Sequence, residues 1–149
     1  MSLHGPYDDN NLFAKILRGE IPAVKVFEDE HVLAFMDIFP QTRGHLLVVP
    51  KNVRARNFLE LPAEKVAPLM ERVQRLTIAT EKALTPDGIT VTQFNGEDAG
   101  QTIFHLHFHI IPRYAGVRLA GHSHGQKADI AELEKLAQQI AAALDQISA

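Results

Sequence analysis

The chain has 149 residues, of which 46% are hydrophobic and 22% charged, so it has the composition of an ordinary globular domain with room for one core. Its formal net charge is −3, whereas proteins that coat a nucleic-acid backbone carry a cationic excess, so we expect no nucleic-acid partner. The absence of cysteine excludes disulfides, thiolate metal sites and a cysteine nucleophile. No apolar run approaches the roughly 20 residues of a membrane span, and the N-terminus lacks the features of a signal peptide, so we expect a cytoplasmic protein without membrane contact.

The first third of the chain predicts a short helix followed by strands. Residues 1–8 are polar and are expected to form a loose N-terminal segment. Asp9 or Asn10 can cap a helix that ends at Gly19. Runs rich in β-branched and aromatic residues then predict three strands, at 24–28, 32–37 and 45–49.

The rest of the chain predicts one long helix, two strands and a C-terminal helix. Residues 62–84 carry apolar residues at helical spacing, and Pro68 should kink this helix or split off its first turn. The last strands are predicted at 89–94 and 104–111, and helical spacing returns at 128–147. Because the strands cluster rather than alternate with helices, we expect a single α+β domain over residues 1–149. It should contain an antiparallel sheet of about five strands, one long packed helix, and a helix near each terminus.

Three histidines alternate with apolar residues in the last predicted strand, as His105, His107 and His109. Side chains on a strand alternate between its two faces, so we expect these imidazoles to share one face while the apolar residues between them pack on the other. Imidazole titrates at about pH 6.5, so one ring can be a neutral nucleophile while its neighbour donates a proton. The row therefore favours acid–base and nucleophilic chemistry on an extended anion.

Two other interpretations of this row stay open. It could be a solvent-exposed face rich in histidine, although such faces usually carry Lys, Glu, Thr or Arg. It could also be a metal site in which His107 and His109 share an ion. His105 and His109 begin about 13 Å apart on a strand, so they converge poorly on one ion, and carboxylates or His45 would have to complete the site.

The loop before the histidines is polar and contains glycine. Gly96 and Gly100 allow backbone N–H groups to approach an anion closely, and Gln101 and Thr102 add side-chain donors. This loop is typical of a phosphate-binding segment and supports the interpretation of the histidine row as a site for a phosphorylated substrate.

The run His-Leu-His-Phe-His-Ile-Ile at 105–111 matches, at every position, a signature in which histidines alternate with apolar residues. It resembles the histidine triad (HIT) superfamily of nucleotide hydrolases and transferases. The supporting segments follow the order found in that family, at 13–16, 19–22, 26–29, 33–38, 45–51, 95–96 and 99–102. The chain is more similar to the histidine triad nucleotide-binding branch and its bacterial relatives than to galactose-1-phosphate uridylyltransferases, which are much longer.

The resemblance implies an enzyme that cleaves purine nucleoside phosphoramidates, adenylates or dinucleoside polyphosphates at the α-phosphorus, through a covalent nucleotidyl-histidine intermediate. His107 would be the nucleophile, and His109 would contact the phosphate and help to protonate the leaving group. His105 and His45 would orient the rings, and Asp37 would bind the ribose hydroxyls. The resemblance also implies that the base pocket is lined by Leu12, Phe13, Ile21, Phe35 and Ile38. It implies that the phosphate and the leaving group are held by Asn95, Gly100, Gln101 and Thr102.

The resemblance also implies a homodimer and no cofactor. Several bacterial relatives carry Cys-x-x-Cys in the first helix, which binds a structural zinc together with histidines, whereas this chain has Asn11 and Ala14 there, so we expect no metal. Two alternative functions stay open, a nucleotide-binding regulatory module with little catalysis and a metal-dependent hydrolase that uses the histidine cluster. His122 and His124 fall in an irregular segment that could cover the site but is expected to be a solvated loop.

Overall fold

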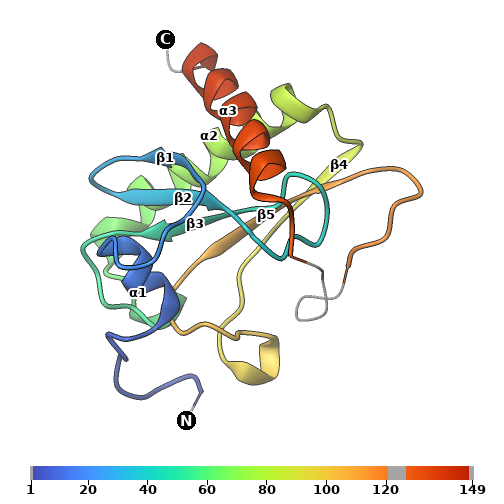
Figure 1. The fold of residues 1–149 in the computed structure, drawn as a ribbon. Coiled ribbons are helices and arrows are strands. Elements are labelled where there is room, and N and C mark those ends of the chain that lie inside the picture. Colours follow the sequence, from blue (N-terminus) through green and yellow to red (C-terminus); the bar gives the residue numbers. More distant parts are fainter. Residues whose placement is uncertain (1, 121–126, 148–149) are drawn as a thin grey trace.

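The computed structural model describes residues 2–120 and 127–147, so His122 and His124 lie outside the described residues. Five antiparallel strands form one sheet in the order β1-β2-β3-β5-β4 (Figure 1). The strands are β1 (Lys25–Glu28), β2 (Val32–Met36), β3 (Leu46–Pro50), β4 (Gly88–Thr92) and β5 (Phe108–Arg113). The helices are α1 (Leu12–Leu17), α2 (Val66–Leu84) and α3 (Ile130–Ile147), with 3₁₀ turns at Phe58–Glu60, Ala63–Lys65 and Glu97–Ala99. The expected α+β architecture is confirmed, and none of the described helices is long and apolar enough to cross a membrane.

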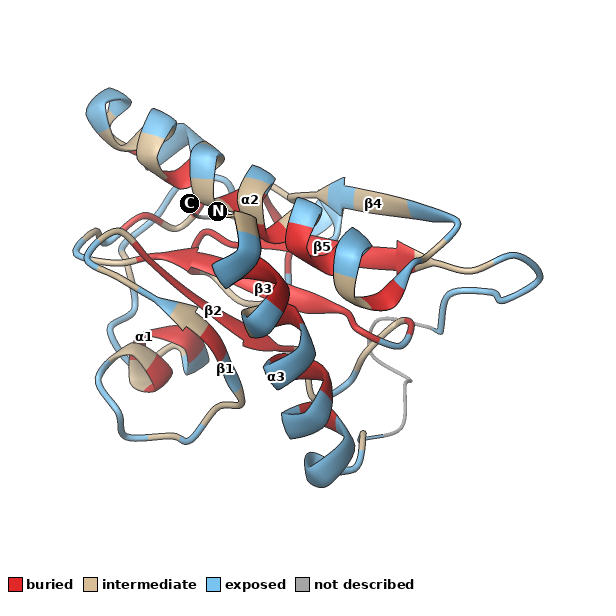
Figure 2. Cartoon of the chain, turned by 90° about the horizontal axis from the view of Figure 1, so that it is seen from above, coloured by how far each residue is buried: buried red, intermediate tan, exposed pale blue. Residues whose placement is uncertain are grey.

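The central strands are buried on both faces, as Figure 2 shows for β2 and β3. On one face, α2 and α3 pack against each other and cover a large core that includes Ala34, Met36 and Val48. On the other face, α1 covers a second, smaller apolar cluster. The members of this second cluster are Phe13, Ile16, Leu33, Phe35, Leu47 and Val49. The period-two alternation of β2 and β3 thus divides their side chains between two separate cores.

Helix α1 begins later than predicted. Its N-cap is Asn11, whose side-chain oxygen accepts a hydrogen bond from the Ala14 N–H at 2.9 Å, so the prediction of Asp9 or Asn10 as the cap is wrong. The Asn11 amide also donates to the carbonyl of Asp8 at 2.7 Å, which closes the turn before the helix. An amide serves this position well because it can satisfy the open N–H groups of the first helical turn.

Pro68 does not interrupt α2. It is the third residue of the helix, where a missing N–H costs no bond within α2 because the carbonyl four residues earlier, that of Glu64, lies before the helix. The turn before it is the separate 3₁₀ turn Ala63–Lys65. The sequence predicted that Pro68 would either kink the helix or split off its first turn. The structure shows a separate first turn.

Strand β5 begins at Phe108, four residues after the predicted start. The preceding main chain leaves the sheet, because the Leu106 N–H donates to the carbonyl of Ala55 in a loop, at 2.9 Å, instead of to a neighbouring strand. His105 and His107 therefore lie before the strand, and only His109 belongs to it. The expectation that all three imidazoles share one strand face is wrong, although His107 and His109 still lie side by side, with their ring centroids 5.0 Å apart.

Candidate active site

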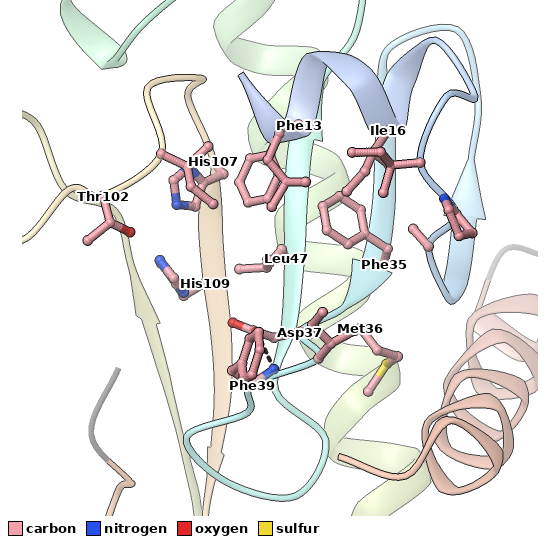
Figure 3. A pocket seen from close by; sticks show the side chains of 16 residues that line it. Phe13, Ile16, Phe35, Met36, Asp37, Phe39, Leu47, Thr102, His107 and His109 are labelled. Carbon is pink, nitrogen blue, oxygen red and sulfur yellow. Dashed lines mark hydrogen bonds between the residues drawn. The ribbon is translucent and has the colours of Figure 1, made fainter. Parts of the chain in front are cut away.

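A cavity of about 390 Å³ opens on the face of the sheet that carries α1 (Figure 3). One side is apolar and is formed by the cluster beneath α1, including Phe13 and Phe35. The other side carries polar groups from Thr102, His107 and His109. The complete lining is Leu12, Phe13, Ile16, Ile21, Pro22, Ala23, Phe35, Met36, Asp37, Ile38, Phe39, Leu47, Thr102, Ile103, His107 and His109. Such a volume, apolar with a few polar groups at one end, suits a small organic ligand.

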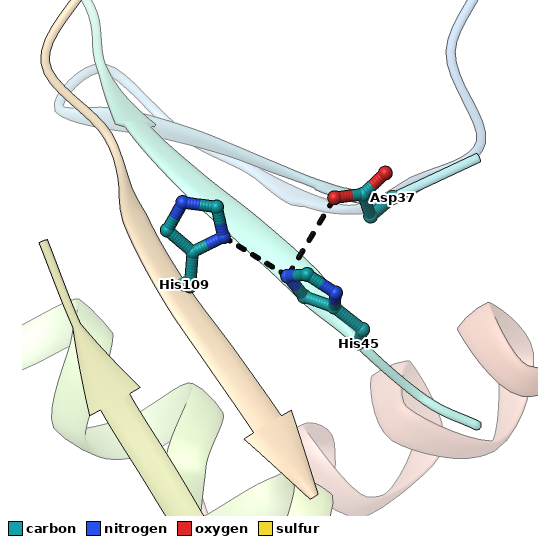
Figure 4. Close-up of side chains that lie close together, drawn as sticks. All are labelled: Asp37, His45 and His109. Carbon is teal, nitrogen blue, oxygen red and sulfur yellow. Dashed lines mark hydrogen bonds and ion pairs between the residues drawn. The ribbon is translucent and has the colours of Figure 1, made fainter. Parts of the chain in front are cut away.

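His109 is held by His45, which lies directly before β3 (Figure 4). The two rings are joined by a hydrogen bond of 3.0 Å between His45 Nε2 and His109 Nδ1, and both are fully buried. The backbone N–H of Gln41 donates to His45 Nδ1 at 3.0 Å, so the proton of a neutral His45 is on Nε2. His45 therefore donates to His109 Nδ1, and a neutral His109 carries its own proton on Nε2.

His107 has the opposite tautomer. Its Nδ1 lies 2.7 Å from the carbonyl oxygen of His105, and a carbonyl can only accept, so Nδ1 carries the proton and Nε2 has a lone pair. The edge-to-face contact with Phe13, at 4.8 Å between ring centroids, fixes the orientation of the imidazole. The centroid of His109 is 5.0 Å away. Two adjacent rings in one cavity thus have complementary roles, one with a basic nitrogen and the other with an N–H donor.

His105 points away from the cavity. Its Nε2 donates to the carbonyl of Pro50 at 3.1 Å, which leaves Nδ1 to accept from the Tyr7 hydroxyl at 2.6 Å. Burial lowers the pKa of His105, since desolvation disfavours the imidazolium and outweighs the opposing hydrogen bond to Pro50. His105 is therefore a neutral, fixed ring whose main-chain carbonyl supports His107.

Asp37 lies at the end of β2 and lines the cavity. Its Oδ1 accepts a hydrogen bond from the Phe39 N–H at 2.8 Å, and its Oδ2 is 3.6 Å from His45 Nε2. The carboxylate thus caps the turn after β2 and places negative charge beside the pair of histidines. Its side chain is 14% exposed, which leaves it accessible from the cavity.

Of the four predicted phosphate-loop residues, Thr102 alone lines the cavity. Gln101 is buried and closes the loop, since its Oε1 accepts from the Gly96 N–H and its Nε2 donates to the carbonyls of Arg56 and Ile103. Asn95 Oδ1 accepts from the N–H of Phe58 and from Gln93. Gly100 has a φ of +108°, which favours glycine. These three residues shape the loop and do not face the cavity.

The predicted base-binding residues Leu12, Phe13, Ile21, Phe35 and Ile38 all line the cavity. The other apolar residues of the lining were not predicted for the cavity. They are Ile16, Pro22, Ala23, Met36, Phe39, Leu47 and Ile103. Leu47 could have been found, because it is the register partner of His109 and so must share its face. Tyr7 was also missed, and no local pattern marks it, because its partner His105 is 98 positions away in the chain.

Asp37, His45 and His109 are the described residues that come closest to a metal-ligand set, with one possible ligand atom each within 4.8 Å of one another. The hydrogen bonds argue for a different use of these groups. Both His45 nitrogens are engaged, with Gln41 and with His109, and an ion between the two rings would have to replace the bond that joins them. The arrangement fits a chain of hydrogen bonds better than a set of ligands.

The fold and the site define an α+β domain in which linked histidines border one apolar cavity. The chain belongs to the HIT family, whose HIT domain matches residues 18–116. An uncharacterized HIT-like protein of Methanocaldococcus jannaschii is 50% identical over 105 residues, which cover 70% of this chain and 80% of that protein. Adenosine 5′-monophosphoramidase of Schizosaccharomyces pombe is 43% identical over 102 residues, covering 68% of this chain and 73% of its own. The crystal structure of a Hit-like protein from Bartonella henselae is similar with a TM-score of 0.87 and 47% identity, and the match covers 93% of this chain and 99% of that one.

Proposed function

We propose that the protein is a nucleotidyl hydrolase or transferase that cleaves purine nucleoside phosphoramidates, adenylates or dinucleoside polyphosphates at the α-phosphorus. The reaction would pass through a covalent nucleotidyl-His107 intermediate. One observation carries this proposal: the hydrogen bonds give His107 and His109 opposite tautomers, and both rings line the same cavity. Similarity to an adenosine 5′-monophosphoramidase supports the same class of reaction.

In the first step, the lone pair on His107 Nε2 attacks the α-phosphorus and the bond to the leaving group breaks. The His105 carbonyl accepts from His107 Nδ1 and so stabilises the positive charge that develops on the attacking ring. His109 donates a hydrogen bond from Nε2 to the leaving atom and so stabilises the negative charge that develops there. The leaving group takes its proton from a water molecule. In the second step, the hydroxide formed from that water attacks the phosphorus, the bond to His107 Nε2 breaks, and the lone pair of His107 is restored.

The remaining roles follow from the two sides of the cavity. Phe13, Phe35 and Ile38 would hold the purine on apolar surface, and Asp37 would accept hydrogen bonds from the ribose hydroxyls. Thr102 would donate to the phosphate. Asn95, Gly100 and Gln101 would act only through the shape of the loop, because their polar groups are engaged within it.

Turnover of adenosine 5′-phosphoramidate by the wild type and by His107→Ala tests the proposal. We expect the variant to lose about 10⁴-fold or more in kcat, as enzymes do without their nucleophile. His31→Ala is the matched control, because His31 follows β1 and does not line the cavity. Mass spectrometry of acid-quenched protein should detect a nucleotidyl adduct on the wild type and none on His107→Ala.

The same assay separates the alternatives. A wild type that binds the nucleotide without turning it over would indicate a regulatory module and would contradict the proposal. Activity that a chelator abolishes would indicate a metal-dependent hydrolase.

We further propose that the protein is a cytoplasmic homodimer. Strand β4 is an edge of the sheet, and Val91 on it and Ile78 on α2 are exposed apolar residues that a second copy could cover. Light scattering coupled to size exclusion should give twice the mass of the chain, and a monomer at micromolar concentration would contradict this proposal.

A further inference from the structure

Residues 2–11 form a strap without helix or strand that lies against the loop after β3. The side chain of Arg56 donates to the carbonyls of Ser2 and Pro6, at 2.9 and 3.1 Å. The amide of Asn57 donates to the carbonyl of Leu3 at 2.9 Å. These bonds hold the main chain of the strap in place, because they pair carbonyls that no helix or sheet ladder satisfies.

A second anchor holds the strap at Asp9. Arg54 binds both carboxylate oxygens of Asp9 through Nε and a terminal nitrogen, at 3.0 and 2.8 Å. The same guanidinium lies over the ring of Tyr7, 5.3 Å from its centroid. Arg18 at the end of α1 donates to the carbonyl of Asp9 at 2.7 Å. Tyr7 is thus fixed between two anchored portions of the strap.

The Tyr7 hydroxyl donates to Nδ1 of His105 at 2.6 Å. Burial raises the pKa of Tyr7 and lowers that of His105, so both partners are neutral around pH 7 and the hydroxyl keeps its proton. With Nδ1 accepting from Tyr7 and Nε2 donating to Pro50, both nitrogens of the His105 ring are held. The main-chain carbonyl of this same residue is the acceptor that sets the tautomer of His107.

We propose that Tyr7 is a positioning residue for the reaction at His107. Its hydroxyl fixes His105, and the carbonyl of His105 in turn keeps the proton of His107 on Nδ1 and the lone pair on Nε2. The inference rests on the proposed function, since it names a residue that supports the nucleophile. Tyr7 does not line the cavity. We therefore expect Tyr7 to affect the reactivity of His107 and not the binding of the nucleotide.

Tyr7→Phe is the direct test, because it removes the hydroxyl and keeps the ring that Arg54 covers. We expect kcat for adenosine 5′-phosphoramidate to fall about tenfold and KM to change by less than about twofold. Tyr114→Phe is the matched control, because Tyr114 is the other tyrosine of the chain and its hydroxyl donates to the exposed carbonyl of Arg43. Both constants should stay within about twofold of the wild type in that variant.

A readout that needs no turnover is the tautomer of each imidazole, measured by two-bond ¹H–¹⁵N NMR on protein labelled at histidine. The wild type should show His107 protonated on Nδ1 and His105 on Nε2. Tyr7→Phe should give a mixture of tautomers at His107, and Tyr114→Phe should leave the spectrum unchanged. If the wild type turns over no nucleotide, the proposed function fails, and the spectra still decide whether Tyr7 orients His107.

Tyr7→Phe with unchanged kcat and an unchanged His107 tautomer would overturn the proposal, even if the variant unfolds at a lower temperature, because the hydroxyl would then be merely structural. If that variant folds too weakly for assay, Arg54→Leu provides the second test. It releases the strap from Asp9 and keeps the hydroxyl, and we expect kcat to fall about threefold at constant KM. An unchanged kcat in Arg54→Leu would then overturn the proposal.

Discussion

Replacement of His45 tests whether His109 acts as a hydrogen-bond donor to the leaving atom. His45→Leu removes the donor to His109 Nδ1 and the acceptor for the Gln41 N–H, both in a fully buried position. Each buried group that loses its partner costs about 1–3 kcal/mol, so we expect a loss of about 2–5 kcal/mol in the free energy of unfolding. In His45→Gln, the terminal amide reaches the position of the imidazole Nε2 and can still donate to His109, so we expect a loss of about 1–3 kcal/mol.

The catalytic effect should depend on the leaving group. Without the bond from His45, His109 can carry its proton on Nδ1, away from the leaving atom. We expect kcat of His45→Leu to fall about 10- to 100-fold with an adenosine phosphoramidate, which corresponds to about 1.4–2.7 kcal/mol of barrier. An AMP ester of p-nitrophenol, whose leaving group departs as an anion, should lose less than about threefold.

The assay compares kcat on these two substrates for the wild type, His45→Leu and His45→Gln, at temperatures where urea unfolding shows each variant to be folded. His45→Gln should retain most of the phosphoramidase activity. Equal losses on both substrates, or a His45→Gln variant as inactive as His45→Leu, would refute the view that His45 acts through the tautomer of His109.

Four further predictions concern the cavity and the buried residues near it. Gln101→Ala removes the acceptor of the Gly96 N–H and the two hydrogen bonds that the Gln101 amide donates. Chemical denaturation should show a loss of about 2–4 kcal/mol in the free energy of unfolding. A loss below about 1 kcal/mol would contradict the role of Gln101 in closing the loop. Asp37→Asn should raise KM about tenfold for a ribonucleotide and leave KM for its 2′,3′-dideoxy analogue within about twofold, whereas equal changes for both would exclude Asp37 from ribose binding. Burial lowers the pKa of His105, so its contribution to stability is full above about pH 6.5 and is lost as the pH falls toward the folded-state pKa. Burial raises the pKa of Tyr7, so its contribution is lost above about pH 10, and urea titrations of Tyr7→Phe should lack that alkaline decline.

The architecture could be predicted because its signals are local. Alternating and continuous apolar runs locate β2 and β3, and helical spacing locates α2 and α3, to within a few residues of their observed ends. The start of β5 could not be predicted in this way. Phe104 to His107 continue the same alternation as the strand, yet Leu106 bonds to the loop carbonyl of Ala55, which is a contact between distant segments.

The site was predicted where residue type determines its chemistry and missed where long-range contacts decide. His107 and His109 were expected from the alternating pattern and His45 from the family resemblance, and the structure joins His45 to His109. Gln101 was expected at the phosphate because its amide can donate, but the loop itself takes up these donors. Residue type shows which bonds a side chain can make, whereas only the fold shows which partners are within reach.

Helix α1 has six residues, far fewer than the 12–15 or so that an isolated helix needs for even marginal stability in water. It persists because Phe13 and Ile16 are buried against the sheet, and the same two side chains form part of the cavity wall. A purine that covers this wall would extend the apolar contact that keeps the helix folded. We therefore expect occupancy of the cavity to slow amide hydrogen exchange in α1 more than in α2 or α3. The part of the cavity wall that α1 forms would then become more ordered when the ligand binds.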